Sequence, residues 1–138
     1  MVAEKPYIIE LPKIHDRRGN LSFVEYPGQI PFDIARTYWI YDVPGGEKRG
    51  GHAFKAQQEV IIALSGSFDV VLHDGFDEYK FSLNRSYLGL YIPKMHWRTL
   101  ENFSTNALAL IVSDEPYKED DYIRDFNQFK EICHKNIQ

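Results

Sequence analysis

The sequence has one cysteine, Cys133, among its 138 residues, so an intramolecular disulfide is excluded. No stretch approaches the roughly 18 consecutive apolar residues of a membrane-spanning helix, and the N-terminus has no apolar segment of signal-peptide length. From these three absences we expect a cytoplasmic protein that does not interact with a membrane.

An excess of positive charge is also missing. The chain has 16 Lys and Arg against 20 Asp and Glu, which gives a net charge of −4. A general nucleic-acid-binding protein needs a basic face to neutralise phosphates, so we do not expect nucleic acid as a partner. A few local arginines would still be enough to hold one diphosphate.

Aromatic residues, by contrast, are abundant, with nine Tyr and nine Phe, and aromatics favour strands. Segments of strand character recur at intervals of about 8–12 residues, the spacing of a sandwich or barrel. The dipeptide Asp74-Gly75 predicts a two-residue hairpin turn, and residues 12–19 are expected to be a polar connection. The predicted strands are 7–11, 20–26, 36–41, 48–54, 58–64, 67–73, 76–83, 88–92, 95–101 and 106–113.

The apolar period changes near the end of the chain. Between Glu119 and Lys135, large apolar side chains recur at helical spacing, with acids early and lysines late, as the helix dipole favours. We therefore predict one amphipathic helix over 119–135, with Cys133 packed on its apolar face. The length suits one domain, 1–138, and the predicted fold is all-β, a jelly-roll barrel with one C-terminal helix.

The sharpest chemical signal lies in residues 49–66, R-G-G-H-A-F-K-A-Q-Q-E-V-I-I-A-L-S-G. The spacing of His52, Glu59 and Gly66 resembles the first motif of the cupin barrels, although Phe54 stands where a metal-binding cupin has a second histidine. His52, Glu59 and His96 are three possible ligands for a transition metal. A metal site therefore stays open as the less favoured alternative, because Phe54 removes the fourth ligand.

Without a metal, His52 becomes a candidate for proton transfer. Glycines beside it, at positions 50 and 51, cost strand propensity and often mark a bulge or the close approach of another group. Arg49 just before them indicates an anion nearby. Glu59 either lies on the polar side of the start of a strand or holds another side chain at a substrate site. Lys55 is a binding candidate for its closeness to His52.

Further candidates come from aromatic and basic residues on other strands. Tyr38 and Trp39 are adjacent, so they point to opposite faces of one strand, and Tyr38 shares its face with Arg36. A buried Arg–Tyr pair facing the barrel interior is costly without a ligand. Aromatics at a barrel mouth can stack on a base or sugar, and three arginines near predicted strand ends could clamp a diphosphate. The aromatic group includes Tyr91 and Trp97 beside Arg98, and the three arginines are Arg18, Arg36 and Arg49.

Several stretches together resemble the sugar nucleotide 3,4-ketoisomerase family, the dTDP-4-keto-6-deoxyglucose 3,4-ketoisomerases that are also labelled WxcM-like. None is diagnostic alone, but their order and spacing are specific and cover nearly the whole chain. They are D-R-R-G-N-L at 16–21, I-P-F-D-I-A-R-T-Y-W-I-Y-D at 30–42, R-G-G-H-A-F-K at 49–55, L-S-G-S at 64–67, L-G-L-Y-I at 88–92 and D-Y-I-R-D-F at 121–126.

The resemblance implies a cupin barrel that works without a metal or other cofactor, usually as a homodimer whose N-terminal strands exchange between subunits. It also implies a dTDP-linked keto sugar as substrate, whose keto group moves from C4 to C3 on the way to amino or deoxy sugars for surface polysaccharide. Position by position, His52 and Tyr38 match the active-site histidine and tyrosine. Arg18 and Arg49 match arginines at the substrate pocket, and Trp97 matches the aromatic before a variable position, here Arg98.

Phe54 departs from the R-G-x-H-A-H-K pattern that is common in this family. The expected mechanism therefore depends on His52 as the base, with an unperturbed pKa near 6.5, and on Tyr38 to donate or relay a proton. Arg98 or Arg18 would offset the developing oxyanion. The departure keeps a non-catalytic dTDP-sugar binder, or one of altered specificity, as the main alternative. A metal-dependent cupin enzyme is the second alternative.

Overall fold

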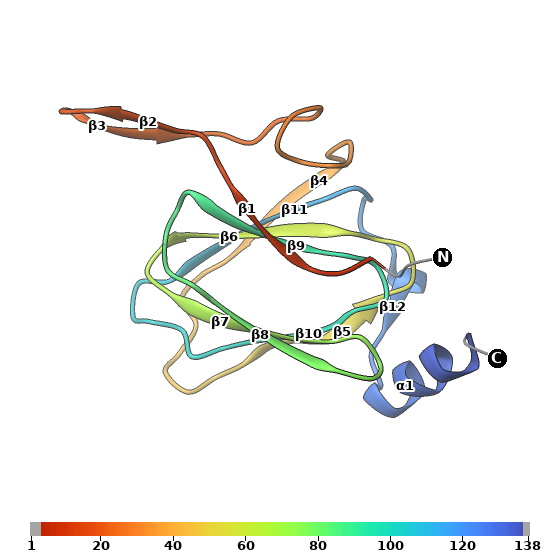
Figure 1. Ribbon diagram of the computed structural model, residues 1–138. Coiled ribbons are helices and arrows are strands. Elements are labelled where there is room, and N and C mark those ends of the chain that lie inside the picture. The colour runs from red at the N-terminus through yellow and green to blue at the C-terminus, as the bar shows by residue number, and fades with distance from the viewer. Residues whose placement is uncertain (1–3, 137–138) are drawn as a thin grey trace.

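Two five-stranded sheets face each other in the computed structural model, which describes residues 4–136 (Figure 1). Every strand pair is antiparallel. The first sheet has the order β1 (Tyr7–Glu10), β9 (Leu88–Ile92), β6 (Glu59–Ser65), β11 (Leu108–Ser113) and β4 (Arg36–Ile40). The second has the order β12 (Tyr122–Ile123), β5 (Arg49–Phe54), β10 (Trp97–Glu101), β7 (Phe68–His73) and β8 (Glu78–Leu83). The predicted all-β jelly-roll barrel with a C-terminal helix, α1 (Phe126–Lys135), is confirmed.

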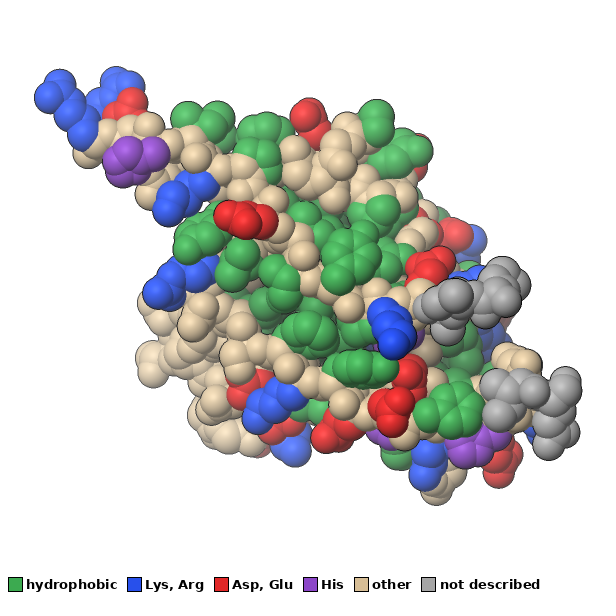
Figure 2. Space-filling view, viewed as in Figure 1, with side chains coloured by type: hydrophobic (Ala, Val, Ile, Leu, Met, Phe, Trp, Pro, Cys, Tyr) green, Lys and Arg blue, Asp and Glu red, His purple; other side chains and the backbone are tan. Residues whose placement is uncertain are grey.

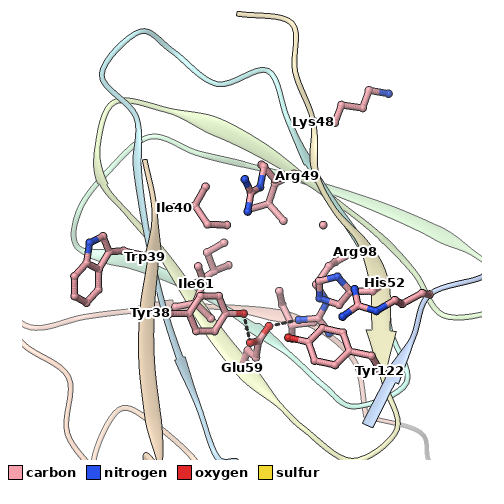
Figure 3. Close-up of a pocket in the computed structure, with 15 residues that line it drawn as sticks. Tyr38, Trp39, Ile40, Lys48, Arg49, His52, Glu59, Ile61, Arg98 and Tyr122 are labelled. Atoms are coloured by element: carbon pink, nitrogen blue, oxygen red, sulfur yellow. Dashed lines mark hydrogen bonds and ion pairs between the residues drawn. The ribbon is translucent and has the colours of Figure 1, made fainter. Parts of the chain in front are cut away.

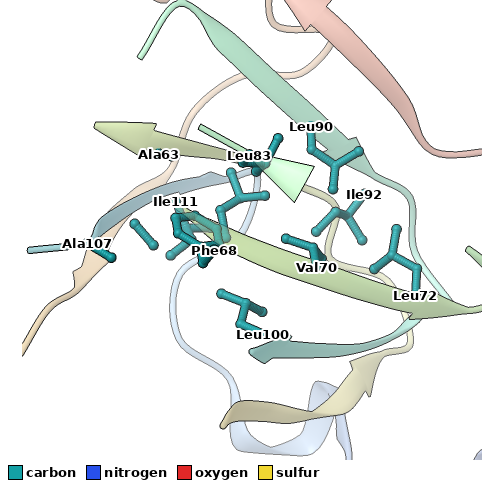
Figure 4. Close-up of a cluster of buried hydrophobic side chains, with 12 residues drawn as sticks. Ala63, Phe68, Val70, Leu72, Leu83, Leu90, Ile92, Leu100, Ala107 and Ile111 are labelled. Carbon is teal, nitrogen blue, oxygen red and sulfur yellow. The ribbon is translucent and has the colours of Figure 1, made fainter. Parts of the chain in front are cut away.

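The main core fills the space between the two sheets (Figure 4). In β7 the alternating residues Phe68, Val70 and Leu72 are at most 1% exposed and point inward, as the pleat of a strand requires. Burying each such side chain contributes about 1.5–3 kcal/mol. The core is completed by Ile61, Ala63, Leu83, Leu90, Ile92, Leu100, Ala107, Ala109 and Ile111.

A second apolar cluster covers the outer side of the first sheet. Leu11, Ile30 and Phe32, from segments outside the sheet, pack against outward-facing residues of β6, β9 and β11. Tyr91 belongs to this cluster. Its hydroxyl donates to Glu4 Oε2 at 2.7 Å, and its ring lies 4.9 Å from that of Tyr7.

Strands β2 (Lys13–Asp16) and β3 (Gly19–Ser22) form a hairpin arm that projects from the barrel (Figures 1 and 2). The prediction that 12–19 is only a polar connection is therefore wrong, because Lys13–Asp16 pairs in register with Ser22–Gly19. Two apolar residues of the arm, Ile14 and Leu21, each have more than half of their surface exposed (55% and 56%). Its turn, a basic tip in Figure 2, contains Arg18.

The C-terminal segment is helical over a shorter range than predicted. Residues Glu119–Asp121 form a 3₁₀ turn, β12 pairs with β5, and α1 begins only at Phe126. Asp125 caps α1 by accepting a hydrogen bond from the Gln128 backbone N–H at 2.9 Å. Cys133 is buried on the helix face, as expected. Neither helical segment between residues 4 and 136 has the length and apolar character needed to cross a membrane.

The predicted two-residue turn at Asp74-Gly75 is a four-residue connection, since β7 ends at His73 and β8 begins at Glu78. The Asp74 carboxylate accepts hydrogen bonds from the backbone N–H groups of Phe76 and Asp77 and so closes the turn through its side chain.

Candidate active site

A cavity of about 450 Å³ lies between the two sheets (Figure 3). Core residues Ile61, Ile92, Leu100 and Ile111 form its apolar wall, while polar side chains enter from β4, β5, β6, β10 and β12. The cavity combines an apolar surface with a few convergent polar groups, as small-molecule sites do. The other lining residues are Tyr38, Trp39, Ile40, Lys48, Arg49, Gly50, His52, Glu59, Arg98, Tyr122 and Arg124.

Glu59 is the polar centre of this cavity, although it is only 2% exposed. Its carboxylate accepts hydrogen bonds from the Tyr38 hydroxyl, from Arg98 Nη1 and from Gln57 Nε2, the last at 2.8 Å. Arg98 is 3% exposed, and its Nη2 donates to the His96 carbonyl at 3.2 Å. The ion pair thus joins β6 of the first sheet to β10 of the second. The expectation that Glu59 holds another side chain is confirmed.

A β-bulge places His52 in the cavity. The register between β5 and β10 shifts, so that Arg98 pairs with His52 and Thr99 with Gly50, which leaves Gly51 as the extra residue. Gly50 and Gly51 have φ of +91° and +75°. A Cβ on Gly50 would lie 2.8 Å from the Arg98 carbonyl oxygen. The glycine pair was expected to mark a bulge or a close approach, and it marks both.

His52 is held neutral by its surroundings. Burial, followed by the positive charge of Arg98, lowers the pKa of His52 to about 3. The expected pKa near 6.5 is therefore wrong for the free protein, because desolvation disfavours the imidazolium. The rings of Phe54 and Tyr122 both lie 5.0 Å from the imidazole. His52 Nε2 is buried and has no hydrogen-bond partner within residues 4–136.

Phe54 lies behind His52 and does not line the cavity. Its side chain is fully buried, edge-on to Tyr122 with ring centroids 4.6 Å apart, and the Arg98 guanidinium carbon lies 4.8 Å from its ring centre. Phe54 therefore supplies low polarity and a cation–π contact at the position where the R-G-x-H-A-H-K pattern has a histidine.

Strand β4 separates the two neighbouring aromatics as predicted. Tyr38 points into the cavity and Trp39 points away from it, 57% exposed (Figure 3). Burial, and then the charge and hydrogen bond of Glu59, raise the pKa of Tyr38 far above its usual range. Tyr38 therefore stays protonated in the free protein.

The C-terminal segment adds two cavity residues that the sequence analysis missed. Tyr122 and Arg124 flank Ile123 around β12, and the Arg124 guanidinium lies 4.2 Å from the Tyr122 ring centre. Glu119 holds Arg124 through two hydrogen bonds of 3.0 Å. The D-Y-I-R-D-F stretch was noticed, but the helical period assigned it to the helix and so hid its strand geometry.

Asp121 fixes this segment to the loop between β5 and β6. Its carboxylate accepts hydrogen bonds from the backbone N–H groups of Ala56 and Gln57 at 2.9 and 3.0 Å. Its backbone carbonyl accepts a hydrogen bond from the backbone N–H of Lys55 at 2.9 Å. Lys55 thus contributes its backbone to this contact.

Five proposed binding residues do not line the cavity of this chain. Lys55 is exposed, and Tyr91 faces the outer cluster. Trp97 packs against α1, with ring centroids 5.3 Å from Phe126. Arg36 lies beyond the cavity, where it donates to Gln57 Oε1 at 3.2 Å. Arg18 lies on the arm, paired with Asp16 at 3.0 Å and 84% exposed.

The three residues considered as metal ligands are not brought together. His96 lies outside the cavity, and its Nδ1 contacts the Lys94 carbonyl at 3.0 Å. Among residues 4–136 there is no cluster of three or more His, Cys, Asp or Glu arranged to hold a metal ion. Glu59 is instead taken up by Arg98, Tyr38 and Gln57.

Comparison with known proteins places this chain among sugar nucleotide isomerases. Residues 4–134 match the family model described as FdtA: WxcM-like, C-terminal. The chain is 37% identical over 128 residues to the TDP-4-oxo-6-deoxy-alpha-D-glucose-3,4-oxoisomerase of Aneurinibacillus thermoaerophilus, covering 93% of this chain and 92% of that protein.

Two solved structures extend the similarity to the fold. A 3,4-ketoisomerase from Helicobacter canadensis is 37% identical, with a TM-score of 0.92 over 96% of this chain and 99% of that one. A variant of the 3,4-ketoisomerase QdtA from Thermoanaerobacterium thermosaccharolyticum, in complex with TDP-4-keto-6-deoxyglucose, is 32% identical, with a TM-score of 0.93 over 97% of each chain.

The bulge can be tested with two matched substitutions. Both glycines have positive φ, so both alanine variants carry similar backbone strain, but only Gly50→Ala places a methyl group against the β10 backbone. We expect Gly50→Ala to lower the free energy of unfolding by about 1–3 kcal/mol more than Gly51→Ala in urea denaturation. Equal losses would show that the close approach at Gly50 does not matter.

Proposed function

This chain belongs to the WxcM-like family of sugar nucleotide 3,4-ketoisomerases, and we propose that it catalyses the following reaction. It converts a TDP-linked 4-keto-6-deoxyhexose, TDP-4-keto-6-deoxyglucose, into the 3-keto isomer. The observation that carries this proposal is a pair of buried nitrogens, His52 Nε2 and Arg98 Nε, that have no hydrogen-bond partner within residues 4–136. They belong to cross-strand neighbours that both line the cavity.

The two nitrogens suit the two requirements of the isomerisation. Neutral His52 Nε2 is a proton acceptor and removes the proton from C3, while Arg98 Nε–H is a donor for the oxyanion that develops at O4. The resulting enediolate has its charge shared between O3 and O4. His52 then returns the proton to C4, which leaves the keto group at C3.

The low pKa of His52 in the free protein is compatible with its role as base. A negative charge close to an imidazole favours the imidazolium. As the oxyanion forms beside His52, the proton affinity of Nε2 rises during the step that needs it. Arg98 is already neutralised by Glu59 at rest, so it opposes protonation of His52 less than an unpaired arginine would.

Cations at the cavity are the proposed site for the diphosphate. Lys48, Arg49 and Arg124 all line the cavity, in an otherwise acidic protein. Arginine and lysine bind phosphate oxygens well. Arg124 and Lys48 thus take the place that the sequence analysis gave to Arg36.

A homodimer is proposed from the exposed apolar surface. An isolated two-stranded hairpin is marginally stable in water, yet the β2–β3 arm projects with Ile14 and Leu21 exposed. The outer side of the first sheet also exposes Trp39 (57%) and Tyr41 (60%). We propose that the arm packs on a second copy of the chain and carries Arg18 toward that copy.

The proposed product would supply amino or deoxy sugars for surface polysaccharide, in the cytoplasm. The chemistry supports this: a 3-keto sugar is the substrate that an aminotransferase needs to place nitrogen at C3. Profiling the TDP-sugars of cells with and without the gene would test it, and an unchanged profile would contradict it.

Nuclear magnetic resonance of the product tests the reaction directly. Incubated with TDP-4-keto-6-deoxyglucose, the protein should yield the 3-keto isomer. His52→Asn should lower turnover by on the order of 100-fold or more, because general base catalysis is lost, while TDP still binds in calorimetry. If the substrate signals only shift on binding, the chain is a TDP-sugar binder, the alternative that Phe54 keeps open.

The pH dependence of kcat/KM reports ionisations in the free enzyme. Because the pKa of His52 is lowered, His52 stays neutral as the pH falls, and its protonation removes activity only as the pH approaches about 3. We therefore expect no loss of kcat/KM with a midpoint near pH 6.5 when rates are measured from pH 8 to 5. Such a midpoint would contradict the neutral, desolvated His52.

Light scattering tests the proposed dimer. The wild-type chain should have twice the monomer mass. Replacing Ile14 and Leu21 together with Glu should shift it toward monomer, because charge on the arm opposes burial. A control with Lys80→Glu, on β8 of the second sheet, should stay dimeric. A wild-type monomer would contradict the proposal.

A further inference from the structure

The proposed isomerisation moves two protons, and His52 carries only one of them. The first goes from C3 to C4. The second must leave the O3 hydroxyl and arrive at O4, because the substrate has its hydroxyl on C3 and the product has it on C4. A group that can both accept and return a proton is therefore needed beside the two oxygens.

Most polar side chains of the cavity cannot do this. Lys48, Arg49 and Arg124 are charged donors without an acceptor site, and Arg98 is likewise a donor only. Two hydroxyl groups remain, those of Tyr38 and Tyr122, since a hydroxyl can accept one hydrogen bond while it donates another. Of these two hydroxyls, only that of Tyr38 donates to a carboxylate within residues 4–136, and the carboxylate is that of Glu59.

Glu59 is placed to receive a proton from the Tyr38 hydroxyl. Its oxygen Oε2 takes hydrogen bonds from Tyr38 and from Gln57 Nε2, and Oε1 takes one from Arg98. The Tyr38 hydroxyl lies against Oε2, and both residues line the cavity (Figure 3). Arg98 is paired with Oε1, which leaves Oε2 to Tyr38 and Gln57.

On the basis of the proposed function, we propose that Glu59, acting through Tyr38, holds the hydroxyl proton of the substrate in transit. The O3–H bond breaks as the Tyr38 oxygen takes the proton, and the hydrogen of Tyr38 passes to Glu59 Oε2. The same two transfers in reverse deliver a proton to O4. The enzyme ends as it began, and no other reactant is consumed.

This arrangement explains how Tyr38 functions although it stays protonated. As a simple acid it would have to become a tyrosinate next to the Glu59 carboxylate, which the raised pKa of Tyr38 opposes. In the relay Tyr38 gives up one proton while it gains another, so it never becomes an anion. Glu59 is therefore a positioning residue with a proton-holding role, and Tyr38 is the catalytic residue that touches the substrate.

Glu59→Gln tests the relay, because glutamine has nearly the same shape and can accept the Tyr38 hydrogen bond but cannot hold a proton. Two rates are compared in deuterium oxide: exchange of the C3 hydrogen of the substrate, which reports His52, and formation of the 3-keto product. We expect product formation to fall by on the order of 100-fold, KM to change by less than about threefold, and exchange to persist. The ratio of exchange to turnover should therefore rise.

A second variant covers the possibility that Glu59→Gln leaves Arg98 unpaired and fails to fold. Tyr38→Phe keeps the Glu59–Arg98 ion pair and interrupts the same relay, so it should raise the ratio in the same way. The double variant should be no slower than the slower single variant, since residues that act as one unit are not additive. As a matched control, Tyr79→Phe removes a tyrosine–carboxylate hydrogen bond outside the cavity, to Asp74, and should leave the ratio unchanged.

Two results would overturn the relay. One is product formation by both Glu59→Gln and Tyr38→Phe within about fivefold of wild type. The other is a loss of exchange and turnover in equal proportion, which would make Glu59 purely structural. A wild-type protein that forms no 3-keto product would instead refute the proposed function, so the two failures are distinguishable.

Discussion

The buried ion pair between Glu59 and Arg98 is the interaction on which the site depends. Each partner is at most 3% exposed, so breaking the pair from one side would leave an uncompensated charge at a cost of about 3–5 kcal/mol. The pair joins the two sheets at the cavity, and each partner affects the protonation of a neighbouring side chain. Glu59 fixes the Tyr38 hydroxyl and adds to the rise that burial causes in the pKa of Tyr38, while the charge of Arg98 adds to the burial that keeps His52 neutral.

The backbone brings these side chains together through two irregular features. The bulge at Gly50 and Gly51 aligns His52 with Arg98 across β5 and β10. Strand β12, two residues long, pairs with β5 at the edge of the second sheet and adds Tyr122 to the cavity. The side chains proposed for proton transfer are thus positioned where regular strand pairing is interrupted. The regular strands form a rigid frame around these side chains.

Most of the strands could be predicted from the sequence, because turn residues and alternating apolar positions reflect the local preference of the backbone for turns and strands. The sequence predicted the inward Tyr38 and the bulge beside His52 for the same reason, since both follow from strand periodicity and glycine conformation. The positions of Tyr91 and Trp97 were not predictable in this way. Alternation says which residues share a face, but not which face meets the other sheet, and long-range packing puts Tyr91 under the outer segment and Trp97 under α1. The pKa of His52 likewise depends on burial by residues distant in sequence.

The proposed function reduces to one claim, that His52 Nε2 removes the C3 proton of a TDP-4-keto sugar in this cavity. The most direct test is exchange at C3, followed by proton resonance of the substrate in deuterium oxide. The wild-type protein should wash the C3 hydrogen out of the substrate, while His52→Asn should bind the same nucleotide sugar and leave that signal intact. Wash-out by His52→Asn at the wild-type rate would show that another group is the base.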